Sequence, residues 1–205
     1  MQMRQRNHGA DMKHIAAIIL ATSVTATGAF AQSADWTGFY VGGSYSDTSD
    51  EDDLSNGGAF AYSLDYDGSG LGLFAGYNMQ RGNLVYGAEL AATPYTTGNP
   101  ADHTGTRNHY FDFKGRLGYS AGSALIYGVL GYSTATTVES PGNVDIDTNG
   151  INYGVGVDYM VSDRFFMGVE LLQRNLDGDY TSSGFPGWTF DGRSQSVSLR
   201  GGFKF

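Results

Sequence analysis

Histidine is the most common general base in enzymes, and this chain has few histidines. Four histidines occur in the chain, and of these His103 and His109 lie beyond Ala31. A nucleophilic serine needs such a base within hydrogen-bonding reach. At two-residue spacing His109 has Arg107 and Phe111 as neighbours, so no serine shares its face of an extended strand. The sequence therefore predicts no catalytic residue, no cofactor and no enzymatic activity.

Residues 145–150, DIDTNG, match the first half of a calcium-binding loop. The twelfth position of such a loop is a glutamate that binds the ion with both carboxylate oxygens. This chain has Gly156 at that position, and the segment lies between two expected strands. The sequence therefore predicts no metal site.

Other charged side chains stand at every second position within apolar, glycine-rich stretches. Asp112, Lys114 and Arg116, for example, alternate with phenylalanine, glycine and leucine. Charges enclosed in a small space persist only when they are paired. The sequence predicts a paired network of four acids and five bases inside the protein, formed by Glu89, Asp112, Asp158, Glu170, Lys114, Arg116, Arg174, Arg200 and Lys204.

Eight stretches with two-residue periodicity must position these charges. They cover residues 36–46, 71–79, 84–93, 109–119, 124–134, 151–160, 165–176 and 193–205. Turns of about four residues alternate with long connections at 47–70, 94–108, 135–150 and 177–192. Short turns on one side and long connections on the other are typical of outer-membrane barrels. The predicted fold is all-β, an eight-stranded antiparallel up-and-down transmembrane β-barrel.

The alternation has three exceptions. Both faces of residues 124–134 are apolar, and Phe74 and Leu172 occupy positions expected to be polar. A soluble β-sandwich would alternate in a similar way, but glycine concentrates on the polar face, as a narrow lumen requires. Tyr and Phe also gather near the strand ends, as in the aromatic girdles of membrane barrels.

Counting along adjacent strands predicts two ion pairs in the lumen. Glu89 is level with Lys114, and Glu170 is level with Arg200. The shear of a barrel can displace either pair by about two residues, so that Arg116 or Arg174 becomes the partner.

The first 31 residues resemble a secretory signal peptide. Lys13 and His14 precede the apolar run 15–21, and Ala29 and Ala31 form a small-x-small cleavage site. The expected organisation is a leader at 1–31, with Met12 as an alternative start, followed by one domain at 32–205. The apolar run is too short to span a bilayer, and no other stretch approaches the roughly twenty apolar residues of a transmembrane helix.

The net charge limits the kinds of binding partner, and the cysteine content limits the covalent cross-links. The formal net charge is −9, and removing a leader that carries three bases and one acid makes it about −11, which excludes nucleic acid as an expected partner. The chain has no cysteine, so disulfides play no part. The long connections between the expected strands are rich in acidic residues, and we expect them to be flexible, solvated loops.

The segments WTGFYVGGSYS, GLFAGYNMQRGNLVYGAEL, GINYGVGVDYMVSDRFFMGVEL and SLRGGFKF give the chain a family resemblance. Together they resemble the small porin-like, OmpA-like outer-membrane β-barrel proteins. The resemblance implies export to the outer membrane of a Gram-negative cell, contact with lipid and lipopolysaccharide, and handling by periplasmic chaperones and the outer-membrane assembly machinery. It also implies that the last expected strand, residues 193–205, carries the signal for outer-membrane assembly in its alternating apolar residues Val197, Leu199, Phe203 and Phe205.

Eight strands enclose an interior just wide enough for side chains to fill. The sequence therefore favours a monomeric protein with a plugged lumen and a structural, envelope-stabilising role. Two alternatives stay open, namely a narrow channel for small solutes and a surface ligand or adhesion receptor acting through the long connections.

Overall fold

The computed structural model describes residues 34–55, 61–94, 97–98, 107–139, 144–179 and 189–205. The predicted leader, with Ala29 and Ala31, lies outside these ranges. Within them the chain forms strands and turns but no helix, and so no helix long and apolar enough to cross a membrane. The strands are β1(Gly38–Ser55), β2(Ala61–Arg81), β3(Leu84–Thr93), β4(Thr97–Gly98), β5(Arg107–Ala121), β6(Ala124–Glu139), β7(Val144–Met160), β8(Phe165–Asp179) and β9(Thr189–Lys204).

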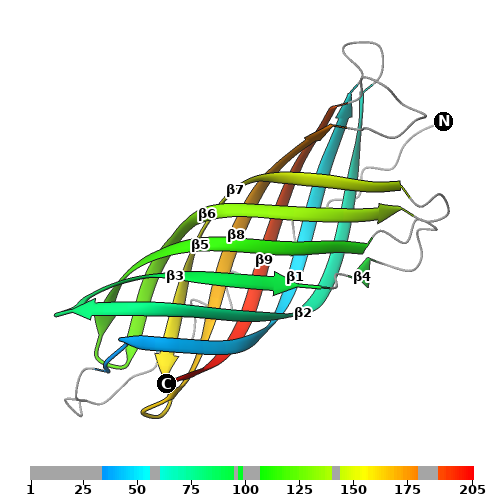
Figure 1. Cartoon of the computed structure of the whole chain (residues 1–205). Helices are drawn as coiled ribbons and strands as arrows, with labels where there is room; N and C mark the ends of the chain where they lie inside the picture. The colour runs from blue at the N-terminus through cyan, green and yellow to red at the C-terminus, as the bar shows by residue number, and fades with distance from the viewer. Residues whose placement is uncertain (1–33, 56–60, 95–96, 99–106, 140–143, 180–188) are drawn as a thin grey trace, which may run out of the picture. The chain divides into compact units, whose positions relative to one another are not determined.

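Eight long strands close into an antiparallel barrel (Figure 1). The eight long strands pair in chain order, and β1 closes the barrel by pairing with both β2 and β9. The two-residue β4 pairs with Gly68 and Ser69 of β2 and with Arg107 of β5. Following the register from Tyr40 around all eight strands returns to Asp50 on β1, a shear of ten residues (50 minus 40). The predicted strand number and topology are confirmed.

Large apolar side chains cover the outer surface. Each long strand contributes some of them, including Val41, Leu73, Leu90, Phe113, Leu130, Val155, Met167 and Leu199. A soluble protein rarely exposes a continuous apolar surface of this extent, whereas a bilayer requires one. The ambiguous segment 124–134 is also resolved, because Leu125, Tyr127 and Val129 face the lumen while Ile126 and Leu130 face outward.

Two of the predicted long connections are mostly strand and a third is partly strand, which corrects the prediction. β1 continues to Ser55 and β2 begins at Ala61, so only 56–60 separate them. β6 and β7 shorten the connection at 135–150, and β8 and β9 shorten that at 177–192. Past the outward apolar residues of the wall the outer face of a strand no longer meets lipid, so both faces can be polar. The ladder of hydrogen bonds then continues without the alternation that reveals a strand in the sequence.

Aromatic rings in the lumen lie over glycines of the neighbouring strand. Tyr40 is opposite Gly76 and Phe74 is opposite Gly42. A Cβ at Gly76 would lie 2.3 Å from the Tyr40 hydroxyl oxygen, and one at Gly42 would lie 2.3 Å from Phe74 Cζ. Tyr127 over Gly156 and Phe166 over Gly202 repeat the arrangement at the same distance. The glycines therefore provide the space that the rings occupy, which explains why Phe74 breaks the polar pattern.

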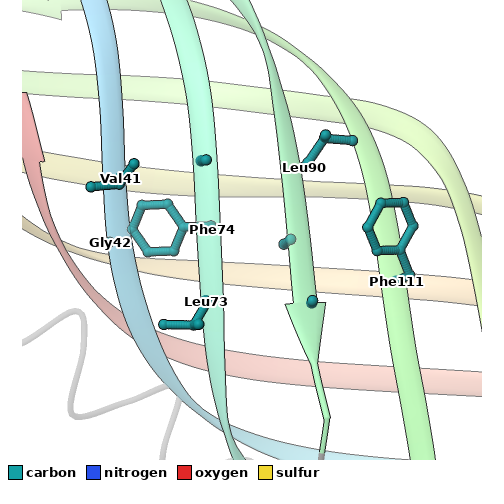
Figure 2. A pocket seen from close by; sticks show the side chains of 9 residues that line it. Val41, Gly42, Leu73, Phe74, Leu90 and Phe111 are labelled. Carbon is teal, nitrogen blue, oxygen red and sulfur yellow. The ribbon is translucent and has the colours of Figure 1, made fainter.

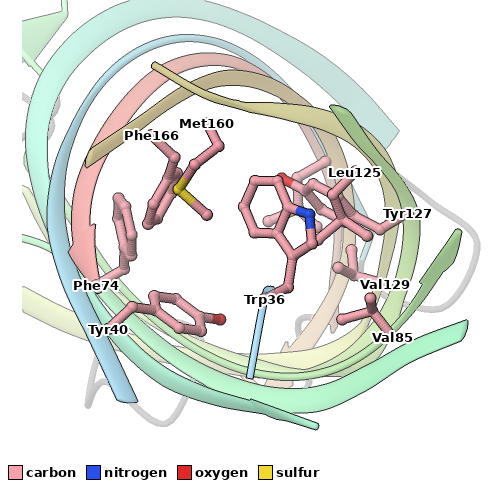
Figure 3. Packing of buried hydrophobic residues seen from close by; sticks show 10 residues of the cluster. Trp36, Tyr40, Phe74, Val85, Leu125, Tyr127, Val129, Met160 and Phe166 are labelled. Atoms are coloured by element: carbon pink, nitrogen blue, oxygen red, sulfur yellow. The ribbon is translucent and has the colours of Figure 1, made fainter. Parts of the chain in front are cut away.

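A hydrophobic cluster fills part of the lumen (Figure 3). The rings of Trp36, Tyr40 and Phe166 pack edge to face, with centroids 5.8–6.0 Å apart. Leu172, the other predicted exception, belongs to this cluster together with Phe74, Val85, Leu125, Tyr127, Val129 and Met160. The lumen is thus filled by apolar as well as charged side chains, and the sequence predicted only the charged part.

Candidate functional site in the barrel lumen

Three acids and three bases form the central lumen network. Glu89 projects from β3, Lys114 and Arg116 from β5, Asp158 from β7, Glu170 from β8 and Arg200 from β9. Every one of these side chains is at most 5% exposed. Because the central lumen network has equal numbers of each sign, its charges are compensated within the barrel.

Glu89 is the centre of this network. Its carboxylate lies 2.7 Å from Lys114 Nζ, 3.1 Å from Arg116 Nη1 and 2.5 Å from Arg200 Nη2. The Tyr40 hydroxyl donates a further hydrogen bond to Glu89 Oε2 at 2.9 Å and accepts one from Arg116 Nη1 at 2.8 Å. A buried carboxylate is stable in such a site because all its neighbours are donors.

The other two acids complete the bridges between strands. Arg116 Nη2 lies 2.6 Å from Asp158 Oδ2, and Lys114 Nζ lies 2.6 Å from Glu170 Oε1. Arg200 contacts both acids, at 2.8 Å to Glu170 and 3.3 Å to Asp158. Each guanidinium also stacks on an aromatic ring, which restricts its movement: the Arg116 Cζ lies 3.9 Å from the centroid of Tyr127, and the Arg200 Cζ lies 4.1 Å from that of Phe74.

A second ion pair lies beside this network. Arg174 donates to both carboxylate oxygens of Asp112, at 2.8 Å each, and its Cζ lies 4.6 Å from the ring centroid of Tyr110. The Tyr110 hydroxyl donates to Asp50 Oδ2 at 2.8 Å. Asp50 was expected in a flexible acidic loop, but it lies on β1 and is buried. The lumen therefore holds a fifth acid that sequence reasoning missed.

Lys204 was predicted to join the network, and this prediction is wrong. Its Nζ donates instead to the backbone carbonyls of Asp35 and Thr37, at 2.5 and 3.3 Å. Lys204 is the last residue of β9, so it lies at the barrel end near the short turns, while the network lies further along the strands. The eight other predicted residues all form ion pairs.

Both predicted ion pairs are in contact, but only one of them has the predicted strand register. Glu89 is directly opposite Lys114, as expected. Arg200 is opposite Gly168 rather than Glu170, a displacement of two residues that the long arginine side chain spans.

The segment before β1, residues 34–37, crosses the barrel end that carries the short turns; we call it the strap. Ala34 N donates to Gly122 O in the β5–β6 turn at 3.0 Å, although β2 and β3 separate β1 from β5 on that side. Trp36 N donates to Gln80 Oε1 at 2.8 Å, and the Trp36 side chain lies within the ring of strands (Figure 3). The hydrogen bond from Thr37 N to Asp35 Oδ1 lowers the pKa of Asp35. The strap thus lies across this mouth of the barrel.

The residues of the predicted assembly signal lie along the outer surface of β9 and at its end. Leu199 and Phe205 are strongly exposed, and Val197 and Phe203 are half-buried. The Phe203 ring packs between Phe165 and Phe205, with centroids 4.9 and 5.2 Å away. Phe205 N donates to Phe39 O at 2.9 Å, so the last residue is anchored to β1.

The other residues singled out in the sequence lie outside the lumen. His109 faces outward on β5, opposite Thr136, and His103 lies outside the described residues. Asp147, from the partial calcium motif, is on β7 and accepts a hydrogen bond from Thr136 Oγ1 at 2.9 Å. Within the described ranges, no group of three or more acids, histidines or cysteines has the arrangement of a metal site.

Solved structures of two bacterial membrane or surface proteins have the same fold. The outer membrane protein OprG of Pseudomonas aeruginosa is 16% identical, with a TM-score of 0.57 over 85% of this chain and 99% of that protein. Neisserial surface protein A is 17% identical, with a TM-score of 0.54 over 82% of this chain and 98% of that protein. At these identities the likeness concerns the fold.

Sequence comparison identifies the family. A 22 kDa outer membrane protein of Rhizobium leguminosarum bv. viciae is 31% identical in an alignment of 134 residues that covers 63% of this chain and 59% of that protein. The family model described as the outer membrane protein beta-barrel domain matches residues 17–203. Because that match spans nearly the whole chain and the structure is a closed eight-stranded barrel, the protein belongs to the outer membrane protein beta-barrel domain family.

Proposed function

We propose that the protein is a monomeric structural component of the outer membrane whose lumen is plugged by its own side chains. The observation that carries the proposal is the burial of eight paired charges across the lumen, from β3, β5, β7, β8 and β9. The strap adds a second closure at one mouth. A barrel filled in this way gains rigidity and gives solutes no continuous path.

The proposed role is non-catalytic. The buried acids and bases neutralise one another, and at two-residue spacing along β5 His109 has Arg107 and Phe111 as neighbours rather than a nucleophilic serine. The outward apolar belt anchors the barrel in lipid, and the anchored β9 end is the expected contact with the assembly machinery.

Electrical recording of the purified, refolded protein in planar bilayers tests the plugged lumen. We expect no sustained open level. A stable conductance in the absence of denaturant would support the alternative of a narrow solute channel instead.

Deletion of the gene tests the envelope-stabilising role. Cells lacking the protein are expected to admit hydrophobic dyes and detergents more readily, and the non-conducting wild-type protein should restore the barrier. Normal permeability of the deletion strain would contradict the structural role while leaving the plugged lumen in place.

One observation favours a second role at the cell surface. β1 and β2 continue past the apolar belt, which ends near Tyr45 and Leu71, by about ten residues each, and this corresponds to roughly 30 Å of strand. Exposed side chains there include Asp47 and Asp67. This hairpin offers a rigid surface to a basic ligand, and loss of cell-surface binding when both acids are changed to asparagine would identify such a ligand.

A further inference from the structure

An apolar groove of about 510 Å³ crosses the outer surface of β1, β2, β3 and β5 (Figure 2). Val41 and Leu73 border one side, and Leu90 and Phe111 border the other. These four side chains face outward and are 45–70% exposed. Ala75 and Ala92 are the other outward residues in the lining, so the groove opens away from the lumen.

The groove follows from the sizes of neighbouring side chains. In one cross-strand row Ala75 stands between Val41 and Leu90, and in the next row Ala92 stands between Leu73 and Phe111. Side chains on adjacent strands that are offset by two residues are within reach of each other. Ala75 and Ala92 have this offset, so their two methyl groups form a hollow between larger side chains.

The groove extends from the middle of the apolar surface toward the end of the barrel remote from the short turns. On β2 the apolar outward residues run from Leu71 to Met79, and Ala75 is at their middle while Leu73 is nearer the long connection. On β5 the groove reaches Phe111, and the next outward residue is His109. Because short turns face the periplasm in outer-membrane barrels, the part of the groove lined by Leu73, Ala92 and Phe111 faces the outer leaflet.

We propose that this groove seats an acyl chain of the outer-leaflet lipid, which in a Gram-negative outer membrane is lipopolysaccharide. The groove is continuous with the apolar belt, so hydrocarbon is the medium that reaches it. An unfilled hollow forfeits dispersion contacts on all its walls, and a flexible chain can follow an irregular surface. The volume also falls within the roughly 300–1,000 Å³ typical of ligand pockets. The proposal does not depend on whether the lumen conducts.

Native mass spectrometry of the detergent-solubilised barrel with added lipid A tests the proposal. The variant Ala75→Phe/Ala92→Phe fills the groove, and Ala88→Phe is the matched control because Ala88 is outward and exposed on β3 but does not line the groove. Wild type and the control should retain lipid A equally. Affinity of the filled variant should fall about tenfold, as expected for losing roughly two buried methylenes. Unchanged affinity in the filled variant would overturn the proposal.

Two further results would contradict the choice of occupant. A phospholipid of equal chain length that bound as tightly as lipid A would refute lipopolysaccharide as the specific occupant. A dimer that dissociates when the groove is filled would show that a second copy of the chain occupies it.

A second measurement avoids filling the groove, in case the double variant does not fold. Because the chain has no cysteine, a single fluorophore can be attached to Ala92→Cys or, as control, to Ala88→Cys. Lipid A carrying a nitroxide on an acyl chain, added as a minor fraction of the vesicle lipid, should quench the label at position 92 more strongly. Equal quenching at both positions would overturn the proposal.

Discussion

Arg200 on β9 and Glu89 on β3 meet across the lumen, with Arg200 Nη2 only 2.5 Å from Glu89 Oε2. β1 and β2 lie between these two strands in the barrel wall. The contact therefore ties together parts of the wall that no backbone hydrogen bond joins. Since Lys114 and Arg116 on β5 contact the same carboxylate, Glu89 connects three strands.

The variant Arg200→Ala should lower the free energy of unfolding by roughly 3–5 kcal/mol, because it leaves Glu89, Asp158 and Glu170 short of a partner in a buried site. Combining it with Glu89→Gln should recover part of the loss. Urea unfolding of the four proteins of the double-mutant cycle, in lipid vesicles, gives the coupling energy.

A coupling energy near zero would mean that Arg200 and Glu89 do not interact in the membrane. Lys204→Ala serves as the control, since Lys204 Nζ donates to backbone carbonyls of the strap rather than to the acids of the central lumen network. It should destabilise the barrel less than Arg200→Ala does.

Replacing Gly156 by alanine should destabilise the barrel by about 1–3 kcal/mol, because the new Cβ overpacks the lumen. It would lie 2.3 Å from Cζ of Tyr127. The matched control is Gly128→Ala, because a Cβ there would face outward and meet only Gly154 O, at 3.8 Å. Equal stability of the two variants in urea titration would contradict the ring-over-glycine packing.

The sequence predicted the membrane-embedded part of the strands well because two-residue alternation and tight turns together specify the register. Glu89 opposite Lys114 is the clearest case, since one register between β3 and β5 determines it. Arg200 with Glu89 could not be predicted in this way. That contact depends on the shear of the closed barrel, and the shear is the sum of eight registers.

Two kinds of lumen residue escaped prediction for separate reasons. Asp50 lies above the belt, where both faces of β1 are polar and no pattern distinguishes inside from outside. Tyr127 lies in a strand that is apolar on both faces. The signal that could have placed Tyr127 is Gly156 directly opposite it, and reading that signal requires the register of β6 with β7.

Leu199→Arg should destabilise the inserted barrel by about 2–4 kcal/mol if Leu199 faces the bilayer near its midplane. Leu199 is 61% exposed on the outer surface. Gln195→Arg is the control on the same face of β9, above the apolar belt, where the cost falls to roughly 0–1 kcal/mol. Refolding into vesicles at increasing urea measures both. An unaffected Leu199→Arg variant would show that the outward face has been assigned wrongly.

The variant Trp36→Ala tests whether the strap or the ion pairs close the lumen. The Trp36 side chain is 2% exposed and packs on Phe166, so its removal should leave a cavity and cost about 3–5 kcal/mol. Trp36→Phe, which keeps an aromatic ring, should cost less. Neither variant should conduct in planar bilayers, because the ion pairs of Glu89, Asp158 and Glu170 remain in place across the lumen. If Trp36→Ala alone produced a sustained open level, closure would depend on the strap, and the paired charges would have to leave a continuous path for ions between them.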